Sequence, residues 1–340
     1  MPEQRRVLLE VKNLKKYFAL KQGFLGRGAG TVKAVDGISL HILQGETLGL
    51  VGESGSGKTT AGRTILRAFD PTDGEIIFHL QDGPPTDLAK LRATELRAFR
   101  RHAQMIFQDP YSSLNPRMTV RDIIAEPLVA GGLAQGDELD ERVRETARRC
   151  QLSLEHLRRY PHAFSGGQRQ RIGIARALVV EPQFVVCDEP VSALDVSIQA
   201  QILNLLMDMQ KELGLTYLFV AHDLSVVEHV SDRVAVMYLG RLVEVAPTAA
   251  LFYQPLHPYT EALMSAIPAL DPDDVMKPVI LEGEIPSPAN PPSGCPFHPR
   301  CSYAQDVCTS DVPAWKEYRP GHFAACHFAD TLSLKGAIKA

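Results

Sequence analysis

The stretch Gly52-Glu-Ser-Gly-Ser-Gly-Lys58-Thr59 decides the fold. It fits the pattern G-x-x-x-x-G-K-[ST] and lies between the apolar run ETLGLV and the helical pattern TTAGRTILRAF, the strand–loop–helix context in which this pattern binds phosphate. Glycines let successive backbone N–H groups turn toward phosphate oxygens, and the helix start adds partial positive charge. We expect Lys58 to reach the β- and γ-phosphates of a nucleotide and Thr59 to ligate Mg²⁺. The predicted contacts are Gly52, Ser54, Gly55, Gly57, Lys58, Thr59 and Thr60. The alternative is a glycine-rich turn that only joins strand to helix.

A second apolar run ends in two carboxylates. In QFVVCDEP, Asp188 and Glu189 follow a strand-like segment, and ligands in open α/β sheets bind at the carboxyl ends of strands. We expect Asp188 to hold Mg²⁺, directly or through water, and Glu189 to polarise the attacking water as a general base. An isolated Asp-Glu pair after a strand is usually a helix cap, so this interpretation depends on the phosphate loop.

Apolar runs alternate with helical patterns up to about residue 265. Several runs, such as TYLFVAH and RVAVMYLG, have no polar alternation, which is typical of parallel strands covered by helices on both faces. The alternation predicts an α/β fold. The segment from about 112 to 165 has helical patterns and no strand-like run, so we expect a helical insertion there.

Composition and charge narrow the class of protein. The chain has 340 residues and a net charge of −4, so it is long enough for two domains and has no basic excess of the kind that nucleic-acid binders carry. No apolar run is long enough to span a bilayer, and the N-terminus has no secretory pattern. We expect a cytosolic location, in which thiols stay reduced.

The C-terminal residues differ in composition. Eleven of the 24 prolines lie between Pro268 and Pro320, and no long apolar period remains. Four cysteines with spacings of five, six and 17 residues argue for a bound metal rather than disulfides in a reducing compartment. Tetrahedral zinc and a 4Fe–4S cluster both suit four thiolates, and a packed region without metal is the third possibility. The cysteines are Cys295, Cys301, Cys308 and Cys326, with His298, His322 and His327 nearby as substitute zinc ligands.

The string Phe164-Ser165-Gly166-Gly167-Gln168-Arg169-Gln170-Arg171 closely resembles the signature sequence of ATP-binding cassette (ABC) ATPases. Alone, it is also explained as a helix N-cap and first turn. Gln108 in MIFQDPYSSLNP resembles the family's Q-loop, Ser192-Ala-Leu-Asp195 its D-loop, and His222 its switch histidine. The order and intervals are similar to those of the family from about residue 6 to 250.

The resemblance implies a fold and a mechanism. The fold would be a P-loop NTPase of the ABC type, with an antiparallel β-subdomain and the helical insertion. Two such domains would pack head to tail around two ATP molecules, so that Ser165, Gly166, Gly167 and Gln168 contact the nucleotide bound to the partner. His222 would contact the γ-phosphate, and Gln108 would join the Mg²⁺ shell. Phe18 would stack on adenine, with Tyr17 as the alternative.

Longer stretches narrow the resemblance to the oligopeptide and dipeptide importers, and to their F-type ATPase in particular. These stretches include KAVDGISLHILQGETLGLVGESGSGKTT, EPVSALDVSIQAQILNLL, the run from His257 to Leu263, and CPFHPRC. The resemblance implies a homologous second ATPase subunit as heterodimer partner, two transmembrane permease subunits and an extracytoplasmic substrate-binding protein. It places the chain on the cytoplasmic face of the membrane, attached only through partners. It divides the chain into an ATPase domain, 1–265, and a Pro/Cys-rich extension, 266–340, and favours a 4Fe–4S cluster in the latter.

Two other functions are possible. A soluble ABC ATPase acting on nucleic acid or ribosomes is disfavoured, because the chain has one cassette and only 106 residues, without a sustained heptad, between Lys58 and Ser165. A binding module whose metal-holding tail is the functional part is disfavoured by the intact Glu189 and His222.

Overall fold

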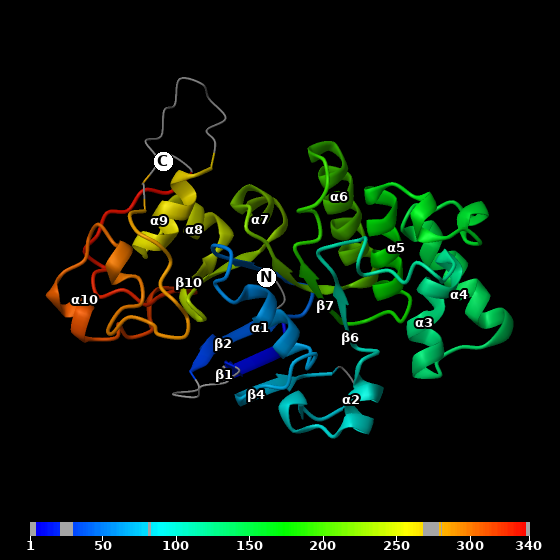
Figure 1. The fold of residues 1–340 in the computed structure, drawn as a ribbon, viewed down its shortest axis with the longest axis horizontal. Coiled ribbons are helices and arrows are strands. Elements are labelled where there is room, and N and C mark those ends of the chain that lie inside the picture. Colours follow the sequence, from blue (N-terminus) through cyan, green and yellow to red (C-terminus); the bar gives the residue numbers. More distant parts are fainter. Residues whose placement is uncertain (1–4, 21–29, 81–82, 268–278, 280, 338–340) are drawn as a thin grey trace, which may run out of the picture. The chain divides into compact units, whose positions relative to one another are not determined.

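The computed structural model describes residues 5–20, 30–80, 83–267, 279 and 281–337. The chain forms two compact units, which we name by their contents. The catalytic-edge unit comprises the described parts of 1–8, 42–46 and 79–220, and the phosphate-loop unit comprises those of 9–41, 47–78 and 221–340. Figure 1 shows the ribbon coloured along the chain, with the helices and some of the strands labelled.

The catalytic-edge unit is built on three parallel strands in the order β6-β7-β8. Every residue of β7 and β8 is buried, which explains why their sequences are apolar without alternation and confirms the α/β prediction. The strands are β5 (Thr86–Asp87), β6 (Ala103–Ile106), β7 (Phe184–Asp188) and β8 (Thr216–Val220); the helices are α2 (Ala93–Phe99), α3 (Val120–Gly131), α4 (Gly136–Arg149), α5 (Gly166–Leu178) and α6 (Val196–Leu213).

Helices α3 and α4 occupy the segment in which the sequence predicts helices without strands. The α3 helix begins where the side chain of Thr119 accepts a hydrogen bond from the Asp122 N–H. The α4 helix buries the stripe of Leu139, Val143 and Ala147, while its charged residues are exposed or half-buried. All of residues 107–165 are described, and they contain helices and turns but no strand.

The phosphate-loop unit contains a mixed sheet and an antiparallel sheet. In the mixed sheet β3 is parallel to β9, while β10 pairs antiparallel with both β9 and β12. The antiparallel sheet has the order β2-β1-β4, as expected for the predicted β-subdomain. The strands are β1 (Val7–Ala19), β2 (Thr31–Leu43), β3 (Thr47–Val51), β4 (Asp73–Phe78), β9 (Arg233–Tyr238), β10 (Arg241–Pro247), β11 (Lys316–Arg319) and β12 (His322–Ala324). The helices are α1 (Lys58–Ile65), α7 (Leu224–Val230), α8 (Thr248–Tyr253), α9 (Pro258–Ser265) and α10 (Asp306–Ser310). No helix among the described residues is both long and apolar enough to cross a bilayer.

The C-terminal region, residues 281–337, is attached to the rest of this unit by strand pairing. Strand β12 extends the mixed sheet at β10, with Glu244 opposite Ala324. The Glu244 carboxylate is fully buried and accepts hydrogen bonds from the backbone N–H groups of Leu256 and His257 and from Nε2 of His322. Strand pairing and this buried carboxylate supply the attachment that the composition of the region did not predict.

We expect the substitution Glu244→Ala to lower the free energy of unfolding by about 3 kcal/mol or more, because it leaves two buried N–H groups and a buried imidazole without their acceptor. Denaturant unfolding followed by circular dichroism measures the change. The matched control is Glu228→Ala on the exposed face of α7. Equal stability of the two variants would contradict the anchoring role of Glu244.

Candidate active site

The backbone of the phosphate loop leaves no room for side chains at two of its glycines. A Cβ atom at Gly52, where φ is +151°, would lie 2.2 Å from the carbonyl oxygen of Met237. A Cβ at Gly57, where φ is +104°, would lie 2.1 Å from that of Ala34. Gly55 also has a positive φ, of +81°, but faces open space. The conformation therefore requires glycine at both packed positions. Between them, Ser54 and Gly55 are exposed and Ser56 is buried.

Lys58 is folded into the loop that it follows. Its side chain is buried, and its Nζ donates hydrogen bonds to the carbonyl oxygens of Gly52, at 2.7 Å, and Glu53, at 2.9 Å. Lys58 is also the first residue of α1, whose N-cap Gly57 has no side chain to satisfy the first N–H groups. An ammonium group beside these N–H groups suits the oxygens of a triphosphate. Of the remaining predicted contacts, Ser54 is exposed while Thr59 and Thr60 are half-buried.

The catalytic-edge unit brings Gln108 and Glu189 together. The Gln108 Nε2 donates a hydrogen bond to Oε2 of Glu189 at 2.8 Å. Glu189 follows β7 and has a φ of +45°, with its N–H donating to the carbonyl of Val220. A left-handed backbone at a non-glycine residue is uncommon and concentrates at functional sites. Asp188, the last residue of β7, is fully buried.

The predicted signature residues form the start of α5. Ser165 is its N-cap, and a reciprocal pair of hydrogen bonds joins Ser165 to Gln168. A Cβ at Gly167 would lie 2.5 Å from Cγ2 of Ile198 at the start of α6, so this glycine permits the two helices to approach. Ser165 and Gln168 are exposed. The cap explanation and the nucleotide-binding explanation are therefore compatible.

His222 is exposed and lies two residues after the end of β8. The next residue, Asp223, is the N-cap of α7 and accepts a hydrogen bond from the Ser225 N–H. Ser192, in the predicted D-loop, donates from its hydroxyl to the Glu189 carbonyl at 3.2 Å. The D-loop is thus tied to the residue predicted to be the general base.

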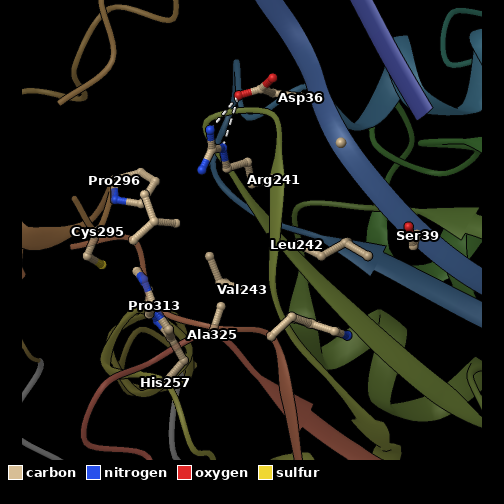
Figure 2. A pocket seen from close by; sticks show the side chains of 13 residues that line it. Asp36, Ser39, Arg241, Leu242, Val243, His257, Cys295, Pro296, Pro313 and Ala325 are labelled. Atoms are coloured by element: carbon tan, nitrogen blue, oxygen red, sulfur yellow. Dashed lines mark hydrogen bonds and ion pairs between the residues drawn. The ribbon is translucent and has the colours of Figure 1, made fainter. Parts of the chain in front are cut away.

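The two aromatic candidates for adenine stacking have different surroundings. The Tyr17 hydroxyl hydrogen-bonds to Asp36, which also pairs with Arg241 at 2.7 Å (Figure 2). Burial and the Asp36 carboxylate raise the pKa of Tyr17 to about 12. Phe18 is 37% exposed and meets Phe69 edge-on, with their ring centres 5.6 Å apart. Tyr17 is held in place by its hydroxyl, so Phe18 stays our prediction for the stacking residue.

The prediction of a metal in the C-terminal region is wrong. The four cysteines line one small cavity with His298 and His327, but nowhere in the described part of the chain do three or more His, Cys, Asp or Glu side chains converge closely enough to hold a metal ion. This removes both the 4Fe–4S cluster and the zinc alternative at Cys295, Cys301, Cys308 and Cys326. They are free thiols, as are the fully buried Cys150 and Cys187.

Sequence reasoning missed one residue of the phosphate loop, Glu53, and the two residues that hold it, Tyr259 and Arg300. Arg300 forms a two-pronged ion pair with Glu53, and the Glu53 N–H donates to the hydroxyl of Tyr259. Hydrogen bonding to Glu53 raises the pKa of Arg300. Glu53 occupies a variable position of the phosphate-loop pattern, so the pattern gives no signal for it. The runs that contain Tyr259 and Arg300 stood out only by family resemblance.

Comparison with known proteins agrees with these features. Residues 35–192 match the family model described as ABC transporter, and residues 243–308 match the oligopeptide/dipeptide transporter C-terminal region. The chain is 51% identical to the oligopeptide transport ATP-binding protein AppF of Bacillus subtilis, covering 95% of this chain and 98% of AppF. It is 54% identical to a peptide import ATP-binding protein of Brucella ovis, and the match covers 94% of this chain and 97% of that protein.

Solved structures are similar over most of the chain. The dimeric ATP-binding cassette MJ0796, bound to ADP and Pi after hydrolysis, has a TM-score of 0.61 and 29% identity, covering 71% of this chain and 99% of that one. The cbiO1 protein from Clostridium perfringens, part of the ABC transporter complex cbiONQ, has a TM-score of 0.60 and 29% identity, covering 73% and 91% of the two chains.

We expect Lys58→Met to weaken MgATP binding by about 10- to 100-fold, because a charge-assisted hydrogen bond contributes about 1.5–3 kcal/mol. Titration with a fluorescent ATP analogue measures the dissociation constant. Lys211→Met, on the exposed face of α6, is the control and keeps the affinity of the unmodified chain. Unchanged binding by the Lys58 variant would remove this lysine from the site.

Proposed function

Because the chain belongs to the ABC transporter family and to its oligopeptide and dipeptide import ATPases, we propose that it hydrolyses ATP to power the uptake of di- or oligopeptides. The observation that carries the proposal is the phosphate loop, in which glycine packing and the buried Lys58 build an anion site at the start of α1. The names of the similar proteins give the class of cargo.

The residues of this chain suit MgATP. The N–H groups of the loop and the ammonium of Lys58 would hold the β- and γ-phosphates, with Phe18 against the adenine. The oxygens of Thr59, Gln108 and Asp188 are the ligand type that Mg²⁺ prefers, and the bound ion would neutralise charge that develops on the phosphates. Glu189 would take a proton from the attacking water, and His222 would orient that water at the γ-phosphate.

The signature residues would act on a nucleotide held by a second subunit. Ser165 and Gln168 are exposed at the start of α5, as binding across an interface requires. The MJ0796 cassette is itself dimeric, which supports a head-to-tail pair that closes on ATP and opens after hydrolysis. The contacts predicted across the interface are Ser165, Gly166, Gly167 and Gln168.

Peptide import further requires partners in the membrane. We infer two transmembrane permease subunits, a substrate-binding protein outside the membrane, and a homologous ATPase as the second subunit, with this chain as the F-type component on the cytoplasmic face. The same inference treats residues 1–265 as the ATPase domain and residues from 266 as an appended region. The named relatives give no support to a soluble ATPase acting on nucleic acid or ribosomes.

We expect Glu189→Gln to keep ATP binding but to lower hydrolysis by about 100-fold or more, because the amide keeps the shape of the side chain and cannot accept the proton. ATP should then hold the subunits in a stable dimer, which size-exclusion chromatography with and without MgATP detects.

The matched control is Glu228→Gln, which changes an exposed carboxylate on α7. In cells, uptake of a labelled dipeptide should be lost with Glu189→Gln and kept with Glu228→Gln. Full ATP turnover by the Glu189 variant would show that another group is the base. Unimpaired uptake of the dipeptide would show that the chain does not serve peptide import.

A further inference from the structure

Glu53 is held through all three of its polar groups. Its carboxylate pairs with Arg300 through two hydrogen bonds, at 2.7 and 3.0 Å. Its N–H donates to the Tyr259 hydroxyl at 2.7 Å, and its carbonyl oxygen accepts from Nζ of Lys58 at 2.9 Å. One residue of the phosphate loop therefore links the C-terminal region to the lysine that binds phosphate.

The two residues that hold Glu53 are themselves firmly packed. Tyr259 is fully buried in α9, and its ring contacts those of Tyr238 and Phe297, with centroid distances of 4.7 and 5.3 Å. Phe297 comes from the C-terminal region and lies three residues before Arg300. The Arg300 side chain is only 6% exposed, and that of Glu53 is 25% exposed. The ion pair is thus largely shielded from water and fixed in direction.

We propose that Arg300 and Tyr259 are positioning residues for nucleotide binding, through which the C-terminal region holds the phosphate loop in its binding conformation. The proposal deepens the proposed function and rests on it. Neither residue is required to touch the nucleotide. They act on Glu53, and Glu53 acts on the position of Lys58.

The geometry indicates how the effect arises. Lys58 donates to the carbonyls of Gly52 and Glu53, so the positions of these two oxygens determine where its ammonium lies. Gly52 is confined by the carbonyl of Met237, and the carbonyl of Ser56 accepts a hydrogen bond from the Gly240 N–H. Between them, Ser54 and Gly55 are exposed, and Glu53 is held by Arg300 and Tyr259. Without Arg300 and Tyr259, the loop gains conformational freedom that nucleotide binding must remove. Removing Arg300 or the Tyr259 hydroxyl should therefore lower the affinity of the chain for ATP.

The arrangement also explains why the residue that pairs with Glu53 is an arginine rather than a lysine. A guanidinium binds both carboxylate oxygens at once and thereby fixes the orientation of Glu53, which a lysine ammonium cannot do. The C-terminal region and the phosphate loop belong to the same compact unit, so the link lies within one packed body.

The first experiment compares Arg300→Met with Arg319→Met in the full-length chain. Arg319 lies in the same C-terminal region but donates to Gln254, away from the loop. We expect Arg300→Met to weaken binding of a fluorescent ATP analogue about tenfold, equivalent to about 1.4 kcal/mol, and Arg319→Met to leave it unchanged. Hydrogen exchange should accelerate at residues 52–58 in the Arg300 variant while the exchange of β12 stays slow, which separates loss of positioning from unfolding.

Two conservative variants test the mechanism. Tyr259→Phe keeps the buried ring and removes only the acceptor for the Glu53 N–H, so it should also weaken ATP binding. Arg300→Lys keeps the charge without the two-pronged contact and should recover only part of the affinity.

A double-mutant cycle between Arg300→Met and Glu53→Gln should be strongly non-additive, because each change removes the same pair. If the unmodified chain binds ATP and the Arg300→Met and Tyr259→Phe variants bind it with the same affinity, this proposal is overturned and the proposed function is left intact. Additive effects in the cycle would likewise overturn it. Failure of the unmodified chain to bind ATP would overturn the proposed function itself.

Discussion

The phosphate loop is constrained by close packing of backbone against backbone, and the remaining features of the site depend on this constraint. The carbonyl oxygens of Met237 and Ala34 occupy the space that side chains would need at Gly52 and Gly57. Because the loop is fixed at both ends, Lys58 has a definite place at the start of α1. A looser loop would present the same residues without a defined geometry for phosphate.

The C-terminal region is integrated with the phosphate loop rather than folded as a separate metal-stapled module. A short proline-rich segment cannot bury enough apolar surface to be stable alone. Here β12 extends the mixed sheet beside β10, and Phe297 packs against Tyr238 and Tyr259. This shared packing supplies the stabilisation that the cysteine pattern led us to expect from a bound metal.

On the catalytic edge, Gln108 and Glu189 share a hydrogen bond although they are predicted to serve different partners. The glutamine is expected to join the Mg²⁺ shell, and the glutamate to accept a proton from water. A contact between the two side chains makes the position of each sensitive to the other. Ser192 adds the D-loop to the same group through the Glu189 carbonyl.

The sequence by itself determined the α/β class and the phosphate loop, and it predicted the residues of the catalytic edge. These features are local: the loop pattern specifies a backbone conformation, and buried parallel strands must be apolar along their whole length. Only the tertiary structure decided the partners of Glu53 and the state of the cysteines. Arg300 lies 247 positions along the chain from Glu53, and spacing alone cannot show whether four thiols converge. Pairings over such separations arise from how the chain packs, and no local pattern of residues records them.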